Sequence, residues 1–107
     1  MTRGPAVLVP ELSPSTGPTV RGDGREVFIL SGRPGGLGMQ DIWTSTRRSI
    51  HDPWSVPVNV GPPVNTEFGD RHPSLSGDGR TLILVSNRPG GFGGDDLWMT
   101  TRTIGGR

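Results

Sequence analysis

The chain has 107 residues with 18 Gly, 11 Pro and a single Ala, so it offers no window long enough for an amphipathic helix. Its net charge is +1 and its Arg residues are spread along the chain, which tells against a nucleic-acid-binding surface. The absence of Cys excludes disulfides, thiolate catalysis and Cys-based zinc sites. Leu, Ile, Val and Phe are frequent enough to predict a folded chain.

The first predicted element is the short apolar run at residues 5–10, PAVLVP, which we interpret as a β-strand. Its two flanking prolines leave too short a stretch for the apolar core of a signal peptide. No apolar run approaches the roughly 18 residues of a membrane span. We therefore expect a soluble chain that is cytoplasmic or, if a leader was removed, periplasmic or secreted.

An internal repeat organises the rest of the chain. Residues 22–25, Gly-Asp-Gly-Arg, recur as residues 77–80, and residues 31–47 match residues 86–102 at the same offset of 55. Half of the positions are identical when residues 18–47 are aligned with residues 73–102 without a gap. Such a period is typical of supersecondary units that stack to make a shared core.

Each unit is predicted to consist of short strands joined by turns. In chain order, the expected strands are residues 26–30, 41–46, 54–60, 72–76, 81–86 and 96–101. Residues 26–30 and 81–86 are nearly continuous apolar runs, so we expect both to be covered on both faces. Residues 54–60 contain Pro57 and are predicted to be an outer strand, because an edge tolerates a missing donor.

The Gly-Asp-Gly segments are predicted turns, in which Asp bonds the nearby backbone and Gly permits a positive φ. Trp43 and Trp98 occupy equivalent repeat positions, which favours packing in the core or between units. Trp54 has no equivalent in the second unit and is predicted to pack on the outer strand.

Four short strands per unit predict an all-β fold of β-propeller blades, each a four-stranded antiparallel meander. S-x-D-G-R precedes an apolar strand, S-N-R-P-G-G-x-G-G-x-D-[IL]-W follows it, and the outer segment reads W-S-x-P-V-N-x-G-P-P-V-N-T. This pattern resembles the TolB-like branch of WD-repeat-like β-propellers over about residues 18–102. Gly22 and Gly77 stand where that family commonly has Pro, and Gly fits the same turn. The resemblance implies the fold but no single activity.

We expect residues 1–107 to form one two-blade unit. Residues 16–65 are the first repeat, and residues 66–107 are the second repeat, which lacks its outer strand. Residues 1–15 carry the strand that we expect to complete a blade of a neighbouring chain. Known propellers have roughly 4 to 8 blades, so a ring requires head-to-tail homo-oligomerisation. The resemblance favours a trimer with six blades, with a dimer or a tetramer as alternatives.

The candidate ligand-binding residues lie mainly in the loops at residues 33–41 and 88–96. They are Arg33, Asp41, Arg88, Asp95 and Asp96, together with His72 as an inner-strand or channel-lining residue. In a closed ring these loops would emerge on one polar face, where propellers engage proteins or small polar ligands.

Residues 90–97 also fit the calcium-binding pattern G-G-x-G-x-D-x-U, although that mechanism needs several stacked copies. The chain has one copy, and Gln40 stands at the position equivalent to Asp95. We therefore interpret the segment as a loop in which Asp41 and Asp96 accept hydrogen bonds from loop amides. A weak calcium site at Asp95 and Asp96 is the alternative, and no cofactor is expected.

No Ser stands in a recognised nucleophile setting, and His51 and His72 occupy different repeat positions, so the sequence predicts no catalysis. The predicted function is a structural scaffold or protein-interaction module that assembles with itself and possibly with another protein. Two alternatives stay open. One is binding of a small polar ligand or glycan at the axial channel or loop face, and the other is a fragment of a larger propeller attached to an enzyme.

Overall fold

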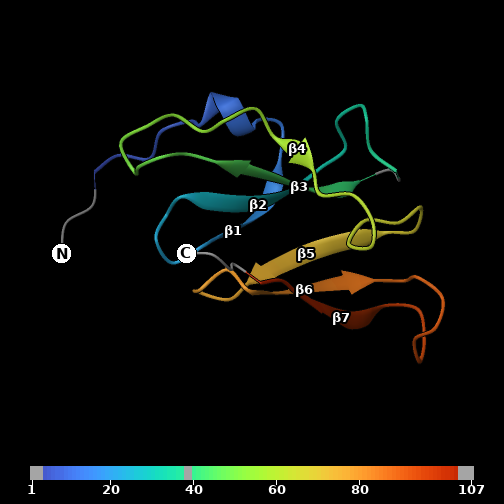
Figure 1. Ribbon diagram of the computed structural model, residues 1–107. Coiled ribbons are helices and arrows are strands. Elements are labelled where there is room, and N and C mark those ends of the chain that lie inside the picture. The colour runs from blue at the N-terminus through green and yellow to red at the C-terminus, as the bar shows by residue number, and fades with distance from the viewer. Residues whose placement is uncertain (1–3, 38–39, 104–107) are drawn as a thin grey trace.

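The computed structural model describes residues 4–37 and 40–103 and consists mostly of β-strands and their connections (Figure 1). The strands are β1 (Thr16–Val20), β2 (Glu26–Ser31), β3 (Asp41–Thr46), β4 (Val58–Asn59), β5 (Asp70–Leu75), β6 (Thr81–Ser86) and β7 (Asp96–Thr101). They form two antiparallel sheets with the orders β1-β2-β3-β4 and β5-β6-β7. The 3-10 turn η1 (Pro10–Leu12) is the only helical element of the described residues. The predicted all-β class is confirmed.

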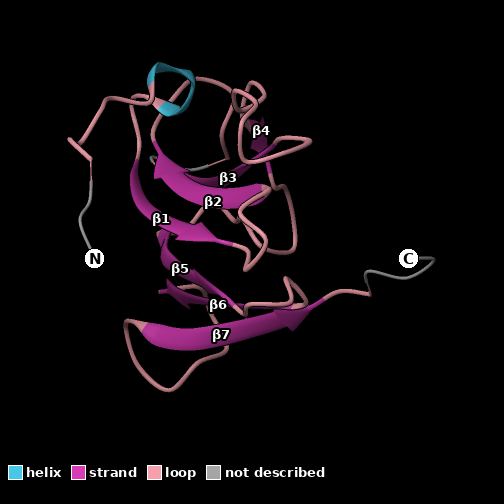
Figure 2. Ribbon diagram, turned by 90° about the vertical axis from the view of Figure 1, so that its left-hand side faces the viewer, coloured by secondary structure: helices cyan, strands magenta, loops and turns pink. Residues whose placement is uncertain are grey.

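The two sheets lie face to face, with the first above the second in both Figure 1 and Figure 2. Strand β5 contacts β1, β2 and β3 of the first sheet. β2 and β6 begin 55 residues apart, and so do β3 and β7. Each residue of β2 and β3 therefore has an equivalent in β6 or β7.

Each sheet has two faces, because successive side chains of a strand point to opposite sides. One face of the first sheet packs against the second sheet, and we call it the leading face; it carries Phe28, Leu30 and Ile42. The face of the second sheet that accepts it is the receiving face; it carries Leu82, Leu84 and Trp98. Val64, in the connection between the sheets, completes this core cluster.

Each sheet also has an outer face, which points away from the other sheet. These are the receiving face of the first sheet and the leading face of the second. The receiving face of the first sheet carries Val27, Ile29 and Trp43, which Leu12 and Trp54 cover. The leading face of the second sheet carries Ile83, Val85, Leu97 and Met99. No described residue outside the second sheet belongs to a core cluster on that last face.

Most predicted strands are confirmed within two residues, but one burial expectation was wrong and the outer strand is shorter than predicted. Residues 81–86 are not covered on both faces: only alternate side chains are buried, because no further sheet lies on the leading face of β6. The predicted outer strand in residues 54–60 is confirmed as the edge strand β4, although its regular part is only Val58–Asn59. On either side, the Ser55 and Val60 N–H groups still donate to carbonyl oxygens of β3. Pro57 has no N–H to donate, and Trp54 turns away to cover the receiving face of the first sheet.

The two ends of the described chain bear on the expected strand exchange. Residues 5–10 pair with no strand of this chain, and the side chains of Val7 and Leu8 are largely exposed. Within the described residues, which end at residue 103, no fourth strand follows β7. The second sheet thus has three strands where the first has four.

The two Gly-Asp-Gly turns have the predicted chemistry. The Arg25 and Arg80 backbone N–H groups each donate to the carboxylate two residues earlier, at 3.0 Å. A hydrogen bond from the Arg21 guanidinium, reinforced by the Arg25 N–H, lowers the pKa of Asp23. The Ser76 hydroxyl, followed by the Arg80 N–H, lowers the pKa of Asp78. Both turns are therefore held by ionised carboxylates.

The turns also bring the two sheets into backbone contact. The Gly22 N–H donates to the Gly77 carbonyl oxygen at 2.8 Å, and a Cβ on Gly22 would lie 2.8 Å from that same oxygen. A Cβ on Gly77 would meet no atom within 4 Å. Gly22 is therefore required for the close approach of the sheets, whereas Gly77, its repeat equivalent, has open space beside it.

We expect Gly22→Ala to lower the free energy of unfolding by about 1–3 kcal/mol, because the new methyl group forces the two turns apart. Gly77→Ala is the matched control and should change stability by less than about 0.5 kcal/mol under monomeric conditions. Urea unfolding of the two variants measures the difference. Equal losses of stability in both variants would contradict the assigned contact.

Candidate interaction surface

The leading face of the second sheet is an exposed apolar surface. On the first sheet, Phe28 is 5% exposed and Ile42 is 0% exposed, because the second sheet covers them. Their repeat equivalents Ile83 and Leu97 are 38% and 75% exposed. Met99, on the same face, is also exposed. A contiguous apolar patch on a folded chain indicates an interaction site.

A strand edge lies next to this face. On the first sheet, the corresponding edge of β3 pairs with β4 through Trp43 with Asn59 and Thr44 with Val58. Among the described residues, no strand pairs with the equivalent edge of β7. An unpaired edge presents N–H and C=O groups that can accept another strand, so face and edge together form the candidate interaction surface.

Asp41 and Asp96 act as the predicted loop clamps. The Asp96 Oδ2 atom accepts hydrogen bonds from the N–H groups of Phe92 at 2.9 Å and Gly93 at 3.2 Å. Asp41 accepts a bond from the Leu37 N–H and another, at 3.0 Å, from the Asn59 side-chain amide. The carboxylates hold the glycine-rich loops, and the second loop presents the exposed ring of Phe92.

Arg33 and Arg88 are tied to the protein itself. The Arg88 guanidinium pairs with buried Asp70 at 2.9 Å and donates to the carbonyl oxygens of Pro63 and Val64. The Arg33 guanidinium donates to the Leu12 carbonyl oxygen at 3.1 Å and also to that of residue 14. Each guanidinium therefore fastens the segment that precedes a sheet onto that sheet.

Asp95 and His72 lie apart from these clamps. Asp95 forms an ion pair with Arg71, whereas Asp96 binds the loop amides. No group of three or more His, Asp or Glu side chains comes together in the described part of the chain. His72 is exposed on β5 at an irregularity of the strand pairing, with φ +53°, and its equivalent Gly17 has φ +57°.

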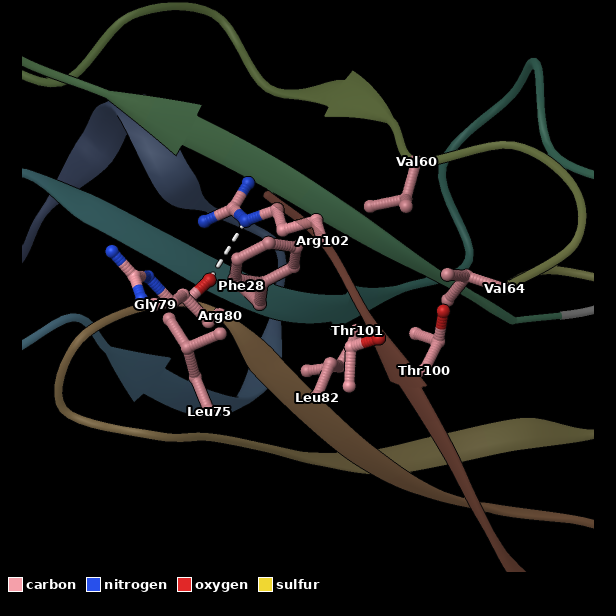
Figure 3. Close-up of a pocket in the computed structure, with 10 residues that line it drawn as sticks. All are labelled: Phe28, Val60, Val64, Leu75, Gly79, Arg80, Leu82, Thr100, Thr101 and Arg102. Carbon is pink, nitrogen blue, oxygen red and sulfur yellow. Dashed lines mark hydrogen bonds between the residues drawn. The ribbon is translucent and has the colours of Figure 1, made fainter. Parts of the chain in front are cut away.

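The seam between the sheets contains a charged cluster that was not predicted from the sequence. Glu26 is buried, and its carboxylate pairs with Arg102 across the seam and with Arg21 at 3.3 Å. Figure 3 shows Arg102 beside Phe28, with its Nε bonded to the Gly79 carbonyl oxygen at 2.7 Å. The available signal was a carboxylate at the start of an apolar strand, where its repeat equivalent is Thr81.

A comparison with models of protein families finds no match, and a comparison with curated proteins finds none either. No helix in residues 4–37 or 40–103 is long and apolar enough to cross a membrane.

We expect His72→Gly to raise the free energy of unfolding by about 1 kcal/mol, because a left-handed φ is unfavourable for a residue with a Cβ. Gly17→Ala is the matched reverse change and should lower stability by a similar amount. Its Cβ would meet only ordinary contacts, the nearest at 3.7 Å from Leu30, so the backbone conformation is the main cause. Thermal and urea unfolding check both; a loss of stability in His72→Gly would contradict the strain.

Proposed function

We propose that this chain is a structural or protein-interaction module that assembles with copies of itself, as a two-blade unit of a TolB-like β-propeller without catalysis of its own. The contrast between Ile42, at 0% exposed, and its equivalent Leu97, at 75%, carries the proposal. The same sheet position is covered in one unit and bare in the next. A further sheet would bury Leu97 in the way that the second sheet buries Ile42.

A head-to-tail contact supports this use of the surface best. In that contact, the leading face of the second sheet stacks on the receiving face of the first sheet of the next copy, which repeats the packing inside the chain. Such a heterologous contact closes into a ring when its rotation allows. Fully burying an exposed Leu or Met side chain contributes roughly 1.5–3 kcal/mol. Burial of Leu97 and Met99, with the exposed part of Ile83, therefore favours the contact.

The N-terminal segment supports the same contact. Leu12 takes the place of Val64, because each packs on the receiving face of its sheet and accepts a bond from the equivalent Arg33 or Arg88 guanidinium. Counting back six residues from each places Ala6 at the position of Val58. Val58 and the residue after it pair with β3 on the first sheet. By the same register, Ala6 and Val7 are suited to pair with the exposed edge of β7 on a second copy.

The size of the ring follows from the number of blades. Three copies would give six blades, which the resemblance to TolB-like rings favours, and two or four copies would give four or eight. Arg33 and Arg88 are engaged inside the chain, so the proposal places no small ligand on them. Nothing in the described surface favours binding of a small polar ligand over self-assembly.

We expect the chain to sediment above its monomer mass of 11.4 kDa. Leu97→Asp should return it to the monomer, because an aspartate cannot be buried unpaired in an apolar contact. Leu37→Asp is the matched control, since it changes an exposed leucine in the loop between β2 and β3 and should leave the mass unchanged. A monomeric parent chain, or an assembly that tolerates Leu97→Asp, would refute the proposal.

Gly77→Ala adds a test of orientation. In a head-to-tail contact, Gly77 takes the place that Gly22 has inside the chain, so its Cβ would press on the Gly22 carbonyl oxygen of the next copy. The substitution should weaken assembly although it leaves the monomer intact. An unchanged assembly would exclude the head-to-tail arrangement.

Removal of residues 1–8 tests the exchanged strand. We expect the truncated chain to remain folded, because it keeps Leu12, which packs on the first sheet, and Glu11, which accepts a bond from the Trp54 N–H. Its assembly should weaken at least tenfold, since β7 loses the strand that pairs with its edge. Analytical ultracentrifugation measures the affinity and circular dichroism checks the fold. An undiminished affinity would remove the N-terminal strand from the contact.

A further inference from the structure

The two receiving faces of the chain are covered by different means. On the second sheet, the receiving face packs against Val64 and against the leading face of the first sheet, including Phe28. On the first sheet, it packs against Leu12 and Trp54. Leu12 takes the place of Val64 by its packing and its arginine contact, and would stay in place in a head-to-tail assembly. Trp54, in contrast, covers the part of this face on which a further sheet would pack.

Trp54 occupies the place on the first sheet that Phe28 occupies on the second. Arg47 and Arg102 are repeat equivalents, and their Nε atoms donate to equivalent turn carbonyl oxygens, at 2.8 Å and 2.7 Å. The Arg102 guanidinium carbon lies 5.6 Å from the centre of the Phe28 ring (Figure 3). The Arg47 guanidinium carbon lies 4.0 Å from the centre of the Trp54 ring. Two equivalent arginines thus hold two aromatic rings against two equivalent faces.

The origin of the two rings differs. Phe28 comes from the leading face of a neighbouring sheet, whereas Trp54 comes from the connection that leaves the same sheet after β3. That connection is held by the Ser55 N–H, which donates to the Thr46 carbonyl oxygen at 2.9 Å, and by the Trp54 N–H, which donates to Glu11 at 3.2 Å. The Ser55 carbonyl oxygen also accepts a bond from the Ser45 hydroxyl at 2.6 Å, and the Ser55 hydroxyl lies 3.1 Å from the Ser45 hydroxyl and accepts from the Thr46 N–H at 3.1 Å. These bonds hold the backbone of Trp54 and all of Ser55, not the indole, so the indole can turn away from the face while β3 keeps its pairing.

We propose that Trp54 is a displaceable plug, and that Ile83 of a second copy takes its place against Arg47 when two copies stack. Ile83 is the repeat equivalent of Phe28, so it is the residue that a head-to-tail contact brings to this position. The inference rests on the proposed self-assembly and names the surface that the second copy meets. The plugged and the stacked states exclude each other.

The charges at the two contacts make displacement reversible. Inside the chain, Arg102 pairs with buried Glu26, whose equivalent on the exposed leading face is Thr81. A second copy therefore offers Arg47 no carboxylate at that position. Among residues 4–37 and 40–103, Arg47 also has no carboxylate partner within the chain. Stacking of copies is thus weaker than the internal seam and depends on concentration.

The test compares the self-association affinity of the full chain with that of Trp54→Ala by sedimentation at a series of concentrations. Removing the plug should tighten association at least tenfold, whereas Trp54→Phe, which keeps an aromatic ring over the face, should stay within about threefold of the parent. Trp54→Leu serves as the second variant if Trp54→Ala does not fold. Trp54→Ala/Leu97→Asp should be monomeric, which separates specific stacking from aggregation through an uncovered face.

Each outcome decides between the two proposals. Tighter association of Trp54→Ala that Leu97→Asp abolishes supports the plug. Unchanged or weaker association of both Trp54→Ala and Trp54→Leu overturns the plug. If Leu97→Asp still disrupts the parent assembly in that case, the proposed self-assembly stands without the plug. Tighter association that survives Leu97→Asp is aggregation and overturns the plug as well. If neither substitution changes a monomeric mass, both proposals fail.

Discussion

The need to cover both faces of each sheet governs the structure of this chain. Two stacked sheets provide one shared layer, in which Phe28 and Ile42 pack with Leu82 and Leu84. That layer leaves two outer faces, and the chain treats them differently. A 3-10 turn and Trp54 cover the first, while Leu97 and its neighbours leave the second exposed. The full burial of β2 and the alternating burial of β6 both follow from this arrangement.

Equivalent arginine side chains make equivalent contacts in the two repeats. Arg33 and Arg88 fasten the incoming segments, and their guanidinium groups lie 5.5 Å and 5.4 Å from the ring centres of Trp43 and Trp98. Arg47 and Arg102 likewise bond to equivalent turns. Because these anchors recur, an outer face presents nearly the same surface as the seam. The main difference is Glu26, a buried carboxylate in the seam whose loss of its arginine partners would be costly.

Local features were predictable because they depend on neighbouring residues. The turn chemistry at Asp23 and Asp78, the loop clamps at Asp41 and Asp96 and the limits of β3 and β7 all follow from residue types at short spacing. Features that need distant segments were not predictable. The Glu26–Arg102 pair joins residues far apart in the sequence, and the displacement of residues 54–57 from the expected strand depends on an uncovered face that attracts Trp54.

The sequence by itself determined that the protein is all-β, built of two equivalent units whose corners are glycine turns, because the period and the turn residues are local properties of the chain. Only the tertiary structure decided which faces are covered. An apolar strand has the same pattern whether its outer side meets a sheet, a tryptophan or solvent. That choice depends on which segments reach it in space, and for β6 and β7 none of the described residues does so on the leading face.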